Sequence, residues 1–112
     1  METNRQRQKS LQKILKDLPK EEFLYELAEF FKIFGDSSRI LILSLLQREK
    51  LCVSEISELS KLSPSAVSHQ LRILRQARLV RYQKSGKEVY YELDDDHIEK
   101  IFEQGLEHIS EI

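Results

Sequence analysis

The sequence has little cysteine, glycine or proline: its 112 residues include one Cys, 3 Gly, 2 Pro and no Trp. A single cysteine excludes an intramolecular disulfide. Few glycines and prolines, together with 40% hydrophobic and 33% charged residues, favour a helix-rich compact chain over a disordered or loop-rich one. No stretch approaches the roughly 18 to 20 apolar residues of a membrane span, and no signal-peptide run follows the first charges. We therefore expect a cytoplasmic protein with no membrane partner.

The charges are sorted along the chain, although the formal net charge is only −1. Residues 61–93 carry 7 basic and 2 acidic side chains, whereas residues 94–112 carry 1 basic and 7 acidic ones. The basic segment points to phosphate contact. The acidic segment contains two of the three histidines and points to a bound cation. Solvated helix faces are the alternative for both segments. The length predicts one domain, residues 1–112.

Apolar residues recur at helical spacing through the first half of the chain. The stripe over Leu11–Leu18 predicts a short amphipathic helix. An aromatic-rich second helix spans Phe23–Phe34 and should end at Gly35 in a left-handed cap. Asp36 is expected to cap a third helix, in which Ile40–Leu46 should be the most buried part. These stripes indicate core or dimer surface rather than a cofactor pocket.

Two short helices are expected in quick succession over about residues 54–77. Ser54 should cap the first of them, with Ile56 and Leu59 facing inward. Ser63 and Pro64 should open the second, as N-cap and first helical residue. Because only about three residues separate the two helices, the pair predicts a helix-turn-helix.

A two-stranded hairpin with a basic tip is expected over about residues 79–93, where apolar residues alternate with polar ones. The last helix is expected over about residues 96–111, with Asp96 and Glu99 spaced like a capping box. The predicted fold class is mainly α (α+β): a winged helix-turn-helix whose N- and C-terminal helices form a dimer interface.

The second helix of the pair separates an anchoring face from a polar face. Val67, Leu71 and Leu74 fall within about 60° of one another on a helical wheel. The opposite face carries Ser65, Ser68, His69, Arg72 and Gln76. Such groups can bind base edges and phosphates in a major groove, and Lys84 and Lys87 at the hairpin can reach the adjacent backbone. Each residue alone is compatible with an ordinary exposed side chain; together they predict binding to double-stranded DNA.

His97 and His108 lie eleven residues apart, so they share a face of the last helix. Their separation along it is about 16 Å, whereas each zinc ligand lies about 2 Å from the ion, so they cannot bind one zinc within one chain. In two antiparallel helices related by a twofold axis, His97 of one would lie near His108 of the other. Asp95 and Glu111 would each add a carboxylate oxygen. Two nitrogens and two oxygens suit four-coordinate zinc, and Co²⁺ or Ni²⁺ is also compatible.

The residues from Phe31 to Glu111 resemble the ArsR/SmtB family of metal-sensing winged-helix repressors. In zinc-sensing members, a C-terminal site is built across the dimer and metal binding weakens operator binding. The resemblance thus implies a homodimeric repressor that binds operator DNA without metal and releases it with zinc. It is carried by Phe31–Ile40, Leu51–Ile56, Ser65–Arg72, the hairpin from Gly86, and the spacing of Asp95 with His97 and of His108 with Glu111.

Two departures from the family pattern are informative. The thiol-rich site of cadmium-, lead- or arsenic-sensing members has a Cys-Val-Cys motif, whereas this chain has Ser54 in place of the second cysteine. We therefore expect Cys52 to be a partly buried small hydrophobe rather than a ligand. Pro64 stands where many relatives carry a Gln in the recognition helix, and proline has no side-chain amide that could contact a base.

Three alternatives remain open at this stage. Asp95 could simply cap a helix, with His97, His108 and Glu111 as surface residues. The chain could be a DNA-binding regulator of the same fold without metal regulation. It could also be a metal-dependent enzyme, but a catalytic site keeps an open coordination position, and four ligands on two helices leave no room for a small organic substrate. The sequence therefore favours a regulator over an enzyme.

Overall fold

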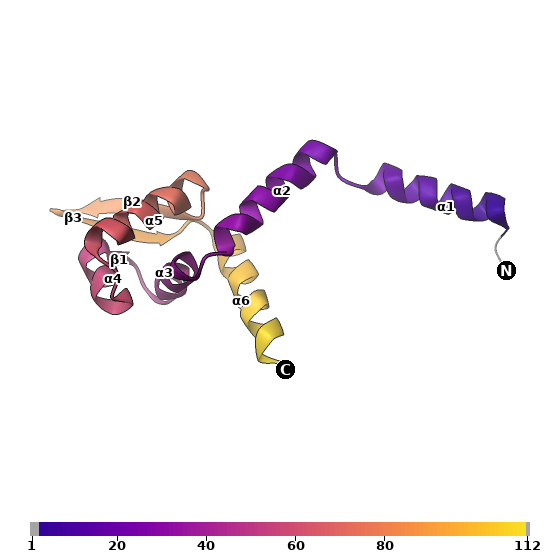
Figure 1. Cartoon of the computed structure of the whole chain (residues 1–112). Coiled ribbons are helices and arrows are strands. Elements are labelled where there is room, and N and C mark those ends of the chain that lie inside the picture. The colour runs from indigo at the N-terminus through magenta and orange to yellow at the C-terminus, as the bar shows by residue number, and fades with distance from the viewer. Residues whose placement is uncertain (1–2, 112) are drawn as a thin grey trace.

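The computed structural model describes residues 3–111. Six helices and three strands are present within that range (Figure 1). In order they are α1 (Asn4–Asp17), α2 (Glu21–Phe34), α3 (Ser37–Arg48), β1 (Leu51–Cys52), α4 (Val53–Ser60), α5 (Pro64–Gln76), β2 (Val80–Ser85), β3 (Glu88–Leu93) and α6 (Asp96–Ser110). None of the helices described here combines the length and the apolar character needed to cross a bilayer.

The core lies where α3, α4 and α5 pack against one another and against the sheet. As predicted, the anchoring face of α5 is buried: Val67, Leu71 and Leu74 are at most 1% exposed. The prediction for α3 was only partly right. Ile42, Leu43 and Leu46 are buried, but Leu41 is 40% exposed, because α3 packs on one side only. Of the two residues of α4 predicted to face inward, Ile56 is buried as expected, whereas the prediction for Leu59 was wrong: it is 56% exposed. The buried hydrophobic cluster comprises Ile42, Leu43, Leu46, Leu51, Ile56, Val67, Leu71, Leu74, Leu79, Val80, Ile98 and Phe102.

Two of the predicted helix starts are confirmed. The side chain of Asp36 accepts a hydrogen bond from the backbone N–H of Arg39 at 3.0 Å, as expected of the cap of α3. Ser63 Oγ accepts from the N–H of Ala66 at 3.1 Å, and Pro64 is the first residue of α5. Three residues, 61–63, separate α4 from α5, so the two form the predicted helix-turn-helix.

Two other predicted caps were wrong. The N-cap of α4 is Cys52, not Ser54. The Glu55 carboxylate accepts a hydrogen bond from the Cys52 N–H at 3.0 Å, so the helix begins two residues earlier than predicted. Gly35 is not left-handed: its φ is −80° and its N–H donates to the Lys32 carbonyl at 3.0 Å. The chain thus passes from α2 into the cap of α3 without a positive φ.

The start of α6 also differs from the prediction by one residue. Asp95 is its N-cap, in place of Asp96. Asp95 Oδ1 accepts hydrogen bonds from the backbone N–H groups of His97 at 2.8 Å and Ile98 at 3.2 Å. The reason lies one residue earlier: the Asp94 N–H donates to the Leu79 carbonyl at 2.9 Å. This bond holds the end of β3 against the start of β2, so the helix begins just after it.

The sheet has three antiparallel strands in the order β1-β3-β2. β2 and β3 form the predicted hairpin, paired from Val80 opposite Leu93 to Ser85 opposite Glu88. Gly86 occupies the turn with φ of +66°, a conformation that glycine adopts without penalty. β1 was not predicted, because two residues are too few to show a strand period.

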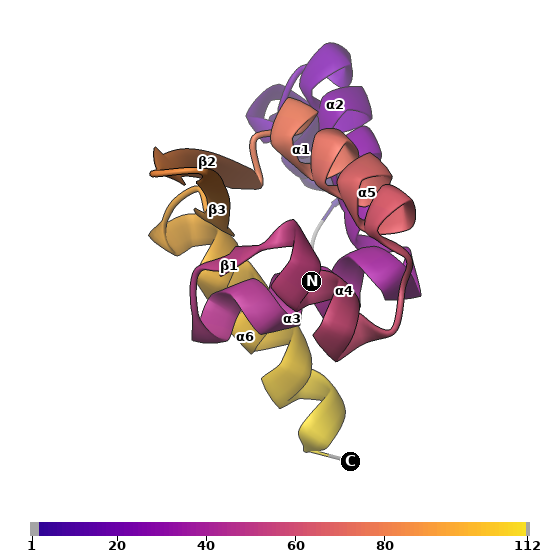
Figure 2. The ribbon, with the colours of Figure 1, turned by 90° about the vertical axis from the view of Figure 1, so that its left-hand side faces the viewer.

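The molecule is elongated, with principal extents of 68 × 33 × 21 Å. In Figure 1, α1 lies far from the packed body and is joined to it through α2, while α6 extends away in another direction. Figure 2 shows the helix-turn-helix, the hairpin and β1 grouped around α3. α1 has no buried residue, so in this chain its apolar stripe is exposed.

Candidate functional site

The helix α5 presents a continuous polar face on the outside of the molecule. The residues predicted to contact DNA from this helix are all exposed: Ser65, Ser68, His69 and Arg72. Gln76 is exposed on the same face. Because the opposite face of α5 is anchored in the core, this surface is held rigidly. Hydroxyl, imidazole and guanidinium groups on one rigid helix can bind base edges and phosphates.

The hairpin is attached directly to this helix by an aromatic contact. The guanidinium carbon of Arg75 lies 4.6 Å from the centroid of the Tyr82 ring, a cation–π geometry. Tyr82 in turn lies 5.9 Å from Tyr91 on the neighbouring strand. The sequence did not predict the contact between Arg75 and Tyr82. A hollow of about 400 Å³ lies beside α5 and is lined by Ser68, Leu71, Arg72, Arg75, Gln76 and Tyr91.

At the base of the hairpin, one carboxylate holds two cations. Glu92 accepts from Arg81 Nε at 2.7 Å and lies 3.2 Å from Lys50 Nζ. The hydrogen bonds from Arg81 and then from Lys50 lower the pKa of Glu92 below its ordinary value. Arg81 is therefore neutralised, whereas Lys84 and Lys87 are exposed on the hairpin. These two lysines are the residues that give the hairpin its free positive charge.

Arg39 joins three helices and was also missed as a functional residue. Its Nε donates to the Ile33 carbonyl in the last turn of α2 at 2.8 Å. Its NH1 group donates to Gln70 Oε1 on α5 at 3.2 Å. The side chain is 17% exposed and lies on α3. The side chain of Arg39 therefore connects the end of α2 to α5.

The four predicted metal ligands lie at the two ends of α6, and all four are exposed. Asp95 and His97 stand at its start, where Asp95 Oδ1 is 3.5 Å from His97 Nδ1. His108 and Glu111 stand at its end. Within residues 3–111 of one chain, no three His, Cys, Asp or Glu side chains come together as a metal-binding group. A four-ligand site from these residues would therefore require a second chain, and the site itself stays a prediction.

The electrostatics at the start of α6 keep the cap carboxylate ionised. Desolvation raises the pKa of Asp95, but the hydrogen bonds from the backbone N–H groups of Ile98 and His97 outweigh it, and the net pKa is lowered. Only Oδ1 is used by these bonds. Asp95 can thus offer Oδ2 as a hard, charged oxygen ligand while it caps the helix.

An apolar groove of about 430 Å³ runs along α6, between this helix, α2 and the start of α3. Several of its residues are exposed to a degree unusual for large apolar side chains, with Phe31 at 52%, Leu106 at 48% and Ile109 at 66%. The groove is lined by Phe31, Phe34, Ile40, Ile101, Phe102, Gly105, Leu106 and Ile109. Surfaces of this kind mark association sites.

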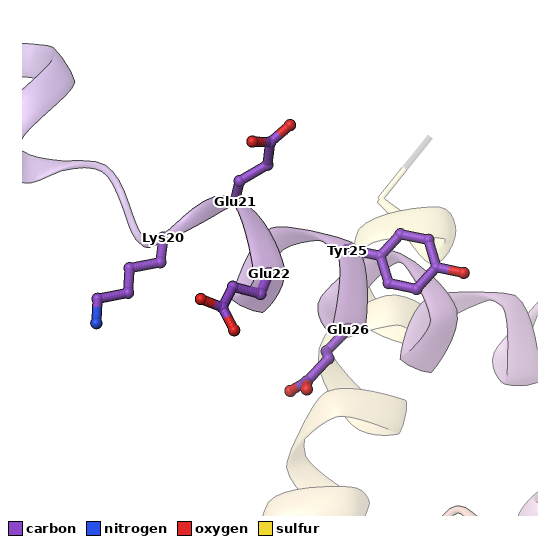
Figure 3. Close-up of a pocket in the computed structure, with 5 residues that line it drawn as sticks. All are labelled: Lys20, Glu21, Glu22, Tyr25 and Glu26. Carbon is purple, nitrogen blue, oxygen red and sulfur yellow. The ribbon is translucent and has the colours of Figure 1, made fainter.

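Two further features bear on the chemistry. Cys52 is buried, with its Sγ 3.2 Å from Ser54 Oγ, so its expected burial is confirmed, while its expected lack of a ligand role stays a prediction. A wide hollow beside the start of α2 is lined by charged residues and a tyrosine, but their side chains point in different directions rather than toward a common centre (Figure 3). This hollow presents no convergent set of groups for catalysis.

Comparison with known proteins gives one consistent result. The family model described as "Bacterial regulatory protein, arsR family" matches residues 36–82, from the cap of α3 to β2. A transcriptional repressor SmtB homolog of Synechocystis is 45% identical over 77% of this chain, and the match covers 65% of that protein. A cadmium resistance regulatory protein, a CadC homolog of Staphylococcus aureus, is 36% identical over 87% of this chain and 80% of its own length.

The solved structures agree with the sequence relatives. The crystal structure of AntR, an antimony-specific transcriptional repressor, superposes with a TM-score of 0.75 and 30% identity, over 85% of this chain and 86% of that one. These relatives are transcriptional regulators rather than enzymes. With a helix-turn-helix, a basic wing and sequence relatives of this identity, the chain belongs to the ArsR/SmtB family of regulatory proteins.

Proposed function

We propose that this chain is a homodimeric transcriptional repressor that binds operator DNA in its metal-free form and releases it when zinc binds between the two α6 helices. One observation carries the proposal: α6 bears an exposed carboxylate and imidazole at each end, beside an unfilled apolar groove. Neither end alone has enough ligands for zinc. Two antiparallel copies of α6 would supply four ligands at each of two places.

The dimer in this proposal is supported by the apolar surface of the terminal helices. The groove along α6 and the stripe of α1 are apolar and exposed, and Leu15 of α1 is 70% exposed. Burying apolar surface stabilises an association by about 25 cal/mol per Å², which favours a dimer that covers both the groove and the stripe. When two chains are related by a twofold axis, this surface of one chain can pack against the same surface of the other. The N- and C-terminal helices then form the interface, and one domain of each chain faces the DNA.

Zinc is the metal that the donor set favours. The proposed site contains two imidazole nitrogens from His97 and His108 and two oxygens from Asp95 and Glu111, and no sulfur. Such a set suits tetrahedral zinc, and two carboxylates neutralise its charge, while Co²⁺ and Ni²⁺ accept the same ligands. The CadC homolog and AntR are named for cadmium and antimony. The only cysteine of this chain is buried, so a thiolate cluster for soft metals is not available within one chain.

Arg39 provides a physical route from the metal to the DNA. Zinc between the α6 helices would change how each α6 packs along the groove against Phe31 and Phe34 of α2. The last turn of α2 is bonded through Arg39 to Gln70 of α5. A displacement in the groove can thus alter the spacing of the two recognition helices without any contact between metal and DNA. Only a difference in zinc affinity between the free and DNA-bound dimers produces such coupling.

The direct experiment is operator binding with chelator and with added zinc, combined with metal content per dimer. The operator is first selected from a pool of random duplexes. We expect two zinc ions per dimer and operator affinity lower by 5- to 150-fold, corresponding to a coupling of about 1 to 3 kcal/mol. Operator binding that ignores zinc, Co²⁺ and Ni²⁺ would instead favour a regulator without metal control. Because zinc binds only the neutral form of an imidazole, the zinc response should weaken as the solution becomes acidic.

A further inference from the structure

Four of the five basic residues of α1 lie on the face opposite its apolar stripe, and the fifth, Arg7, falls on the apolar side. At 100° per residue, Leu11, Ile14 and Leu15 fall within an arc of about 100°. The residues on the opposite side fall within an arc of about 80°. This basic face of α1 consists of Arg5, Lys9, Lys13 and Lys16. One side of the helix is thus suited to pack on protein and the other to meet negative charge.

Within residues 3–111, no ion pair neutralises the positive charge of this face. All four side chains are exposed. Among residues 3–111, no acidic side chain lies within ion-pairing distance of any of them. α1 contains a single acidic residue, Asp17 at its last position. From Arg5 to Lys16 the cations extend about 16 Å along the helix, long enough to contact several phosphates of one strand.

The position of α1 in the molecule favours a contact with the same duplex that α5 binds. In both Figure 1 and Figure 2, α1 lies at the height of α5 and the hairpin, whereas α6 extends to the opposite side. The long axis of the chain measures 68 Å, which corresponds to about 20 base pairs of duplex. One protomer is therefore long enough to reach DNA well outside a single major-groove site.

We propose that the basic face of α1 binds backbone phosphates of the DNA that flanks the site recognised by α5. This surface adds a second contact that does not depend on sequence. The inference rests on the proposed function, because it presupposes that α5 binds an operator. It goes beyond it by assigning the N-terminal helix to the DNA interface as well as to the dimer.

Two properties of α1 favour a duplex over a lipid surface as the partner: its basic charge, and the covering of its apolar face in the proposed dimer. An amphipathic helix binds a bilayer by burying its apolar face in it. In the proposed dimer the apolar face of α1 is already covered by the second copy, and only the basic face remains accessible. Phosphates on a duplex need no apolar contact and bind an exposed row of Lys and Arg by counterion release.

The test is the salt dependence of binding to two duplexes of different length. The short duplex contains only the selected operator, and the long one extends it by about one helical turn, roughly 10 base pairs, at each end. The variant Lys9→Gln/Lys13→Gln removes two cations of the basic face, and Lys9→Arg/Lys13→Arg is the matched control that keeps them. The dimer carries this pair of lysines twice, and the long duplex is extended at both ends. On the long duplex, the Gln variant should therefore lose about 3.6 units of the slope of log K against log salt, at about 0.9 per phosphate contact. The Arg variant should match the wild type, and on the short duplex all three proteins should bind alike.

The outcomes separate this inference from the proposed function. If wild type prefers the operator to random duplex, but the Gln variant shows the wild-type slope on both lengths, the inference is wrong and the proposed function stands. A wild-type protein without any operator preference would overturn the proposed function and this inference with it. Vesicles of phosphatidylcholine and phosphatidylserine supply the third arm. Binding to them that depends on Lys9 and Lys13, without a slope change on DNA, would assign the basic face to a membrane and overturn the inference.

Discussion

Asp95 and His97 are joined in two ways: Asp95 Oδ1 lies 2.8 Å from the backbone nitrogen of His97 and 3.5 Å from its Nδ1. One carboxylate therefore starts α6 and also lies beside the imidazole proposed to bind zinc. The two roles use different properties of the side chain. The cap needs only a hydrogen-bond acceptor, which Asn supplies as well as Asp, whereas the metal favours a charged oxygen.

Substitution of Asp95 should separate these roles. Asp95→Asn keeps the cap and should leave the melting temperature nearly unchanged, but zinc binding should weaken because one charged ligand is lost. Asp95→Ala loses the cap as well, and its melting temperature should fall by roughly 3 to 5 °C. Thermal unfolding and zinc titration of both variants measure the two effects. Unchanged zinc affinity in Asp95→Asn would remove Asp95 from the ligand set.

The exposed face of α5 and the hairpin should differ in what they contribute to DNA binding. Ser68→Ala or His69→Ala should reduce the preference for operator over random duplex, because the proposed function places these side chains against the bases. Lys87→Ala should weaken binding to both duplexes and lower the salt slope by about two units, one for each protomer, because the proposal assigns this lysine to phosphate. Salt titrations on both duplexes measure these effects. Equal losses on the two duplexes for all three variants would contradict base recognition by α5.

Arg39 should carry the zinc response from α2 to α5. Arg39→Gln leaves the Ile33 carbonyl and Gln70 without their donors, so the free energy of unfolding should fall by about 1 to 3 kcal/mol. In this variant, zinc should no longer lower the operator affinity, while the free dimer should bind zinc as tightly as wild type. Arg48→Gln, an exposed position of the same helix, is the control and should behave as wild type. A full zinc response in Arg39→Gln would place the coupling elsewhere.

The ion pairs at Glu92 should contribute a pH-dependent part of the stability. The pKa of Glu92 is lower in the folded chain than in the unfolded one, because Arg81 and Lys50 donate to the carboxylate. Its stabilisation is therefore fully present above the unfolded value of about 4.3 and is lost as the pH falls through the folded value. Glu92→Gln should melt at a lower temperature than wild type near neutral pH. This difference in melting temperature should disappear under strongly acidic conditions.

Thermal unfolding across the acidic range measures this effect. Glu88→Gln on the same strand is the control, because the side chain of Glu88 is exposed. It should show no pH-dependent difference from wild type. A difference between Glu92→Gln and wild type that stays constant down to strongly acidic pH would mean that packing, and not charge, stabilises this position.

Periodicity predicted the parts of the fold that local sequence determines. The buried side of α5 follows from a 3.6-residue repeat, and the hairpin follows from alternation around Gly86. Features that depend on distant contacts were not predicted. The Asp94 N–H bonds to Leu79, fifteen residues away, and so selects Asp95 rather than Asp96 as the cap among three consecutive acidic residues.

The same distinction holds for the candidate site. The exposed polar residues of α5 and the two pairs on α6 follow from helical spacing, because spacing alone sets which side chains share a face. Arg39 could not be predicted in this way: Gln70, its partner on α5, is 31 residues away, and nothing in the local sequence specifies that contact. The stacking of Arg75 on Tyr82 likewise depends on how the hairpin folds back against α5.

The most direct test of the intersubunit zinc site is a mixed dimer of two single variants. His97→Ala and His108→Ala homodimers should each lose the zinc response and still bind operator, because neither residue lies on α5. In the heterodimer of the two, both losses fall in one intersubunit site and the other site keeps all four ligands. We expect this heterodimer to bind one zinc ion tightly. A heterodimer that binds none would contradict a site shared between subunits, since ligands drawn from within one chain would leave no site intact.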